Sequence, residues 1–230
     1  MRKKPFVAGE YYHVYNRGVD KRNIFSDQND VQRFLQSMRE FNTKEPIGSI
    51  YENSFVKPQL GRETSKLPKL GKLPKSNQKL VDFIAYCLNP NHFHFILRPL
   101  SDNGLSEFIK RLAGGYTKFF NNKSNRLGVL FQGVFKSIHV NSNKYLLYLS
   151  AYVNLNNEVH QLGNETSKSS KLVRNSFNEY INNEPGFCTK EIILEQFNSK
   201  KEYGIFVKEV VGEIAKRRKE DKDFEKLLLE

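Results

Sequence analysis

Two apolar stretches separated by a short turn dominate the middle of the sequence. Residues 81–88 (VDFIAYCL) form a continuous apolar run, and residues 92–98 (HFHFILR) follow after Asn89-Pro90-Asn91. A run of this length and composition is typical of a strand buried on both faces, whereas Asn and Pro favour a turn. The sequence therefore predicts two successive strands at the centre of a sheet.

Strand-like and helix-like patterns surround this central pair. Val31, Phe34, Leu35 and Met38 recur at helical spacing after Asp27, which predicts a helix that begins at an aspartate cap. The other expected elements are strands over 10–16, 47–56 and 129–140, helices over about 105–119 and 142–155, and a helical stretch over 189–230.

The length of 230 residues is that of one domain with additions. We expect a principal domain over 1–160, a polar linker and loop over 161–188, and a helical extension over 189–230. Residues 57–79 are rich in Pro, Gly and Lys and predict a flexible insertion. Part of that insertion, LGRETSKLPKL (60–70), matches LGNETSKSSKL (162–172) at eight of eleven positions, and the role of this duplication stays open.

Composition excludes several classes of protein. No apolar window reaches the length of a membrane span, and two cysteines are too few for a disulfide framework or a Cys-rich zinc site. A reducing cytoplasm is the expected location. The formal net charge of +12 favours nucleic acid or another polyanion as partner without choosing between them.

The first candidate functional feature is a pair of histidines on one predicted strand. His92 and His94 are two residues apart, so their side chains point to the same face of the strand. Phe93, Phe95 and Leu97 take the opposite face, which can anchor the strand in a core. Two imidazoles on one rigid strand can chelate a divalent metal, although a His-x-His pair alone is weak evidence.

The second feature lies on the predicted helix KYLLYLSAYVNLNN. Tyr152 and Asn156 are four residues apart and share one helical face. A metal held by two histidines and an amide oxygen can bind a phosphate, and a nearby tyrosine can attack phosphorus. The product would be a covalent phosphotyrosine, which conserves the energy of the phosphodiester for rejoining the DNA elsewhere.

These residues give the chain a resemblance to a known family, the single-tyrosine HUH transposases of bacterial insertion sequences. Within this family it is nearer the branch associated with repetitive extragenic palindromes, the REP-associated tyrosine transposases. The matching segments are YYHVYNRG (11–18), IFSD with its helix (24–41), AYCLNPNHFHFIL (85–97), FQGVFKSIHV (131–140) and YLLYLSAYVNLNN (145–157).

The resemblance implies an α+β, ferredoxin-like antiparallel sheet with packed helices and a metal-dependent DNA-nicking and strand-transfer activity. Tyr152 would be the nucleophile, with His92, His94 and Asn156 as ligands of Mg²⁺ or Mn²⁺. Apart from the resemblance, Asn91 next to His92 is expected to orient a metal ligand without binding the metal itself. The implied substrate is single-stranded DNA with a hairpin or palindromic repeat, cleaved to a 5′-phosphotyrosine and a free 3′-OH.

The sequence departs from the family where a proline is usual, at Asn157, and where a methionine is usual, at Leu88 or Asn89.

Tyr148 has the spacing to Tyr152 that two-tyrosine HUH enzymes use, but we assign it to the core. His13 faces either the sheet surface or the core. Candidate DNA contacts on elements flanking the site are Arg17, Lys110, Arg111, Lys118 and Lys136.

Two other functions remain open at this point: an HUH replication initiator or relaxase, and a non-catalytic nucleic-acid-binding module on a ferredoxin-like sheet. The sequence gives neither the recognised DNA sequence nor the oligomeric state, which could be a homodimer. It also leaves open whether this copy is active, and whether the tyrosine helix serves its own subunit or a partner's.

Overall fold

The chain was analysed as a computed structural model that describes residues 5–50, 78–161, 172–182 and 184–227. The flexible insertion expected at 57–79 therefore lies outside the described residues except for its last two positions. The first copy of the duplicated peptide (60–70) lies wholly outside them, and of the second copy (162–172) only Leu172 is described.

Five strands form one antiparallel sheet in the order β4-β1-β3-β2-β5. The strands are β1 (Tyr11–Arg17), β2 (Val81–Asn89), β3 (His92–Pro99), β4 (Lys136–Val140) and β5 (Arg174–Asn175). Together with the helices α1 (Gln28–Glu40) and α3 (Gly104–Lys123), the first four strands give the order β-α-β-β-α-β. This is a ferredoxin-like arrangement, as expected, with a fifth strand added at the β2 edge.

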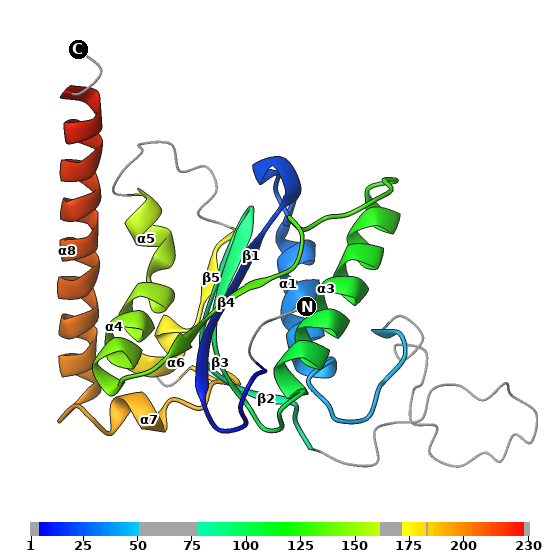
Figure 1. Ribbon diagram of the computed structural model, residues 1–230, viewed down its shortest axis with the longest axis horizontal. Helices are drawn as coiled ribbons and strands as arrows, with labels where there is room; N and C mark the ends of the chain where they lie inside the picture. The colour runs from blue at the N-terminus through cyan, green and yellow to red at the C-terminus, as the bar shows by residue number, and fades with distance from the viewer. Residues whose placement is uncertain (1–4, 51–77, 162–171, 183, 228–230) are drawn as a thin grey trace, which may run out of the picture.

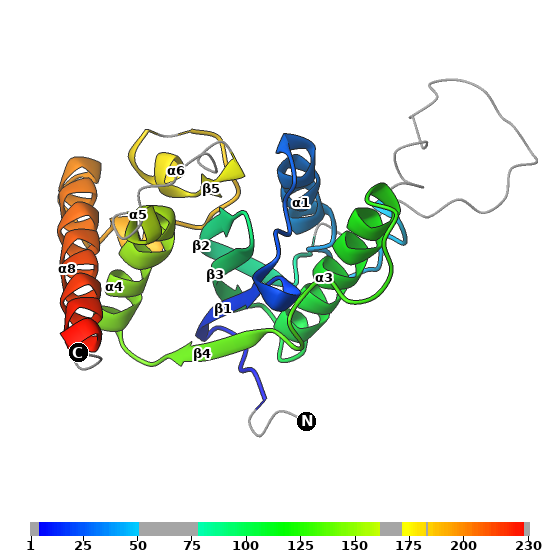
Figure 2. The same ribbon diagram turned by 90° about the horizontal axis from the view of Figure 1, so that it is seen from above.

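Helices cover both faces of the sheet, as the two views in Figures 1 and 2 show. One face carries α1 and α3. The other carries α4 (Asn143–Asn154), α5 (Asn156–Gln161) and the long α8 (Lys200–Leu227), which runs beside α4. The remaining elements are the 3₁₀ helix η1 (Val19–Lys21), α6 (Phe177–Ile181) and α7 (Glu191–Leu194).

The alternation of side chains along β3 divides the core into two clusters. Phe93, Phe95 and Leu97 pack with α1 and α3, whereas Ile96 packs with α4 and α8. Since successive residues of a strand point to opposite faces, His92 and His94 share the α4 face with Ile96. The prediction that the phenylalanines anchor the strand in a core is confirmed.

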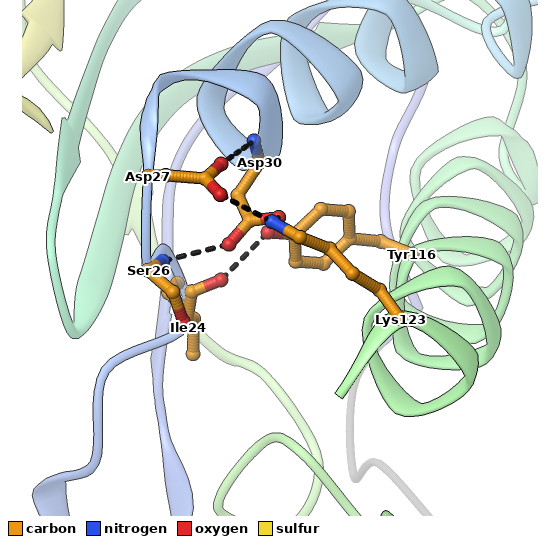
Figure 3. Close-up of polar contacts among 6 residues, drawn as sticks. All are labelled: Ile24, Ser26, Asp27, Asp30, Tyr116 and Lys123. Atoms are coloured by element: carbon orange, nitrogen blue, oxygen red, sulfur yellow. Dashed lines mark hydrogen bonds and ion pairs between the residues drawn. The ribbon is translucent and has the colours of Figure 1, made fainter. Parts of the chain in front are cut away.

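A polar junction joins the beginning of α1 to the end of α3 (Figure 3). The carboxylate of Asp27 accepts a hydrogen bond from the backbone N–H of Asp30 (3.0 Å), as the sequence predicted for this helix cap. Lys123 Nζ contacts Asp27 Oδ2 at 2.7 Å and Asp30 Oδ1 at 2.5 Å. Asp30 is fully buried and its other oxygen accepts from the backbone N–H of Ser26. The junction therefore neutralises a buried carboxylate while it fixes the two helices.

Several boundaries differ from the sequence prediction. The strand expected over 129–140 begins only at Lys136, because residues 129–135 form an irregular segment with Gly133 at φ +65°. The part of the strand expected at 47–56 that is described, residues 47–50, is not a strand. The helix expected over 142–155 ends at Asn154, since Leu155 leaves helical geometry (φ −120°, ψ 30°).

The tip of the β2–β3 hairpin is held by the segment that follows β1. Pro90 O accepts backbone hydrogen bonds from Ile24 (2.7 Å) and Phe25 (3.0 Å), and Asn91 O accepts one from Gly18 (2.8 Å). Asn91 also donates from its side chain to a backbone carbonyl in η1 (3.2 Å). The beginning of β3, where the histidine pair lies, is thus fixed by contacts beyond the sheet.

Candidate active site

The histidine pair lies at the junction of β2, β3 and the turn between α4 and α5. Cross-strand register places Asn89 of β2 opposite His92, and Cys87 opposite His94. Tyr15 and Arg17 of β1 lie opposite His94 and His92 on the other side. The site is therefore built on three adjacent strands of a buried sheet, which gives its side chains little freedom to move.

His92 is held in one tautomer by Asn91. The Nδ1 atom of His92 lies 2.6 Å from Asn91 Oδ1, and an amide oxygen can only accept, so the proton is on Nδ1. This leaves the lone pair on Nε2, which faces Asn156 Oδ1 at 3.3 Å. Burial lowers the pKa of His92; the hydrogen bond that a protonated ring would donate to Asn156 raises it, and the charge of Arg17 lowers it further. The neutral form, which can bind a metal, is favoured.

His94 is oriented by His13, a residue that the sequence left between surface and core. His13 Nε2 lies 2.9 Å from His94 Nδ1, and the two rings stack with centroids 5.1 Å apart. His13 is buried, which lowers its pKa to about 4 and keeps it neutral near pH 7. A neutral His13 can accept from His94 Nδ1 and so leave the Nε2 lone pair of His94 for a ligand.

The tyrosine helix places Tyr152 of the same chain against His94. The two rings meet edge to face, with centroids 5.6 Å apart, and Tyr152 also meets His13 at 6.2 Å. Tyr152 is half-buried and so reaches the surface of the site. Tyr148, four residues earlier, is half-buried against the core cluster under α4.

Helix α4 owes its position to a buried polar network with α8. Asn154 donates to the hydroxyl of Tyr203 (2.8 Å) and accepts from Ser176 Oγ (2.5 Å), and Tyr203 donates to Ser150 Oγ (3.2 Å). All four side chains are buried. The C-terminal helix therefore fixes the rotation of α4, which carries Tyr152.

Asn156 is fully buried but is not on the same helix as Tyr152. It begins α5, after the break at Leu155, whereas the sequence placed it one turn further along a single helix. Its Oδ1 atom faces His92, and among the described residues its Nδ2 atom has no hydrogen-bond partner. This Oδ1 atom also accepts a hydrogen bond from Asn89 Nδ2 at 3.0 Å, so an acceptor oxygen lies beside the histidine pair.

The residues present fit a divalent metal. Within the described part of the chain, no three His, Cys, Asp or Glu side chains form a group that could hold an ion. The set here instead combines two imidazoles, a donor type that suits divalent transition metals, with an amide oxygen, a donor type that suits Mg²⁺ and Mn²⁺.

The predicted DNA contacts separate into two groups. Arg17 and Lys136 are exposed on the face of the sheet that carries the histidines, since Lys136 lies opposite Tyr15. Lys110, Arg111 and Lys118 belong to α3, which covers the other face. Arg111 is moreover engaged with Glu107 and with the carbonyl of Thr43 (2.6 Å). The structure therefore does not bring the α3 cations to the site.

Two residues at the site were not singled out by the sequence reasoning. Tyr15 stacks on His94 with centroids 5.5 Å apart, and Asn89 contacts both His92 and Asn156. The signal for Tyr15 was its two-residue spacing from His13, which places both on one face of a strand. The signal for Asn89 was the short turn, because a two-residue connection sets residues 89 and 92 opposite each other.

None of the helices in the described part of the chain has the length and apolar character needed to cross a membrane.

Comparisons with known proteins give one family match and one similar solved structure. Residues 71–156 match the family described as "Transposase IS200 like", a stretch shorter than half of the chain that contains the histidine pair, Tyr152 and Asn156. The chain is also similar to a solved structure of a REP-associated tyrosine transposase bound to a REP hairpin. The identity is 11% over 79% of this chain and 84% of that one, with a TM-score of 0.43. Over residues 71–156, which carry the candidate site, the chain is therefore similar to the IS200-like transposases.

Proposed function

We propose that the chain is a metal-dependent DNA transposase that nicks single-stranded DNA and transfers the strand through Tyr152. The observation that carries the proposal is the meeting of Tyr152 with His94, on the face where His92 and Asn156 converge. The substrate that we propose, single-stranded DNA with a hairpin or palindromic repeat, follows from the family resemblance.

In the proposed reaction the phenolic oxygen of Tyr152 attacks phosphorus. A bond forms between the tyrosine oxygen and phosphorus, and the bond from phosphorus to the 3′ oxygen breaks. The phenol gives up its proton, the departing oxygen gains one, and the products are a 5′-phosphotyrosine and a free 3′-OH. Reversal of this step with a different 3′-OH joins the strand to a new end.

His92, His94 and Asn156 would hold Mg²⁺ or Mn²⁺, which would act there as a Lewis acid on the phosphate. Asn91 contacts Nδ1 of His92, and His13 contacts Nδ1 of His94. Each contact directs the Nε2 lone pair of that histidine into the site. Tyr203 and Asn154 hold α4 in place, so that the separation between Tyr152 and the sheet stays constant.

The test is the covalent protein–DNA adduct. Wild-type protein is incubated with hairpin-bearing and hairpin-free oligonucleotides, with Mn²⁺ or with a chelator, and resolved under denaturing conditions. We expect a metal-dependent adduct with the hairpin DNA, loss of the adduct in Tyr152→Phe, and its retention in the matched Tyr148→Phe.

The alternatives give different outcomes. An adduct that disappears only in Tyr148→Phe would show that the nucleophile is misassigned. An initiator or relaxase would form the adduct without a requirement for the palindromic repeat. A non-catalytic binding module would shift the DNA in a native gel but give neither a cut nor an adduct.

A further inference from the structure

The inference concerns Asn89, the last residue of β2, and it rests on the metal site of the proposed function. Asn89 is buried with 4% of its surface exposed, although it lies next to a hairpin turn. Its Nδ2 atom lies 3.1 Å from His92 Nε2 and 3.0 Å from Asn156 Oδ1. Asn89 therefore contacts the two atoms that the proposed function assigns to the metal.

Those two atoms cannot bond to each other. With its proton on Nδ1, His92 presents a lone pair at Nε2, and Asn156 presents a carbonyl oxygen, so two acceptors face each other at 3.3 Å. Such a pair requires a positive group between or beside its members. In the described structure the amide group of Asn89 supplies the hydrogens that both acceptors need.

The three atoms form a triangle with sides of 3.0, 3.1 and 3.3 Å. Neighbouring ligands in an octahedral shell with bonds of about 2.1 Å are separated by about 3.0 Å. The triangle thus has the size of one face of such a shell. Rotation of the Asn89 amide by half a turn exchanges its nitrogen and oxygen with almost no change of shape, and then all three corners are acceptors.

We propose that Asn89 is a further metal ligand, contributing its amide oxygen beside His92, His94 and Asn156. The same side chain has two roles according to its rotation. With Nδ2 inward it donates to His92 and Asn156 and holds them in place; with Oδ1 inward it completes the ligand face. The cross-strand register, which sets Asn89 opposite His92, keeps the amide in position for both.

The test is Mn²⁺ binding by the full chain without DNA, measured by titration, with water-proton relaxation to count the waters on the bound ion. Asn89→Leu keeps the branching of the side chain at Cγ and removes the oxygen. We expect affinity to fall by about tenfold or more and the number of bound waters to rise by one. Asn89→Asp retains a ligand oxygen with a negative charge, and we expect tighter binding than in wild type with no added water.

Asn157→Leu is the matched control. Asn157 directly follows the proposed ligand Asn156, but its side chain contacts Asn175 rather than the histidines. It should bind Mn²⁺ as wild type does. Wild-type affinity and hydration in Asn89→Leu would overturn the inference while leaving the proposed function intact. If Asn89→Leu does not fold, weaker binding or an added water in Asn89→Asp overturns it. A wild-type chain that binds no Mn²⁺ overturns both.

Discussion

His13 shows how burial of a single residue sets the chemistry of its neighbours. Its imidazole projects from β1 against the rings of His94 and Tyr152, and its Nε2 atom forms a hydrogen bond with His94. Burial lowers its pKa from 6.5 to about 4, because the charged ring would lose its hydration. The unfolded chain therefore binds a proton at this residue in a pH range where the folded chain does not.

This shift predicts the pH dependence of stability. Between pH 6.5 and about 4 the unfolded state holds more protons, so the free energy of unfolding should fall as the pH is lowered, by up to about 3 kcal/mol from His13. Urea unfolding in a chelator at pH 7 and pH 4.5 measures this loss.

The loss should be smaller in His13→Gln and unchanged in His139→Gln, since His139 is exposed on β4. Equal pH dependence in wild type and His13→Gln would contradict the assignment. Burial also lowers the pKa of His92. His92 therefore adds to the loss of stability at low pH in the wild type and in His13→Gln alike.

At the scale of single elements, the junction between α1 and α3 links two helices that the sequence separates widely. Asp30 has no exposed surface, and its carboxylate is compensated by Lys123 and a backbone N–H. Removal of one partner of a buried ion pair leaves a charge without compensation, which is more costly than the pair is stabilising. The hydrogen bond from Lys123 also lowers the pKa of Asp27.

We therefore expect Lys123→Met to lower the free energy of unfolding by about 3 kcal/mol near pH 7. Lys118→Met, an exposed change on the same helix, should alter it by less than about 0.5 kcal/mol. Chemical denaturation of both variants measures the difference. An effect of Lys123→Met no larger than that of Lys118→Met would show that solvent already compensates Asp30.

The elements predicted correctly are those with a strong local pattern. Strands β2 and β3 and helix α1 followed from apolar periodicity and from the Asp27 cap, and the shared face of His92 and His94 followed from strand alternation. Strand β5 could not be predicted in this way, because its two residues, Arg174–Asn175, are too few to show an alternation of apolar and polar side chains. The end of α4 at Leu155 also has no local breaker, and tertiary contacts of Asn154 and Asn156 decide it.

The site was only partly accessible from the sequence for a related reason. The sequence proposes the histidines, Tyr152 and Asn156 because they stand in short motifs. Asn89 and Tyr15 join the site through cross-strand register, which depends on the pairing of whole strands rather than on neighbours in the sequence.

At the scale of the molecule, the sheet separates the histidine face from the layer formed by α1 and α3 (Figure 2). A single strand of DNA that reaches Tyr152 would meet cations on the former face. Among the described residues, the cations that the sequence proposed for DNA are therefore divided between the two faces.

DNA binding should reflect this separation. In a Tyr152→Phe background, Arg17→Gln should weaken binding of hairpin-bearing single-stranded DNA and reduce the salt dependence of log K by about 0.7. Lys118→Gln should change neither. Fluorescence anisotropy titrations at several salt concentrations measure both quantities. Equal losses in the two variants would mean that DNA also contacts α3.

The support beneath the β2–β3 turn has a consequence for local motion. The tip of a two-residue hairpin is usually where a sheet opens first, because few bonds oppose it. Here Pro90 and Asn91 accept backbone bonds from three amides, those of Gly18, Ile24 and Phe25. These amide protons should exchange with deuterated solvent as slowly as those inside the central strands, so that His92 remains in place through fluctuations that open the edges of the sheet.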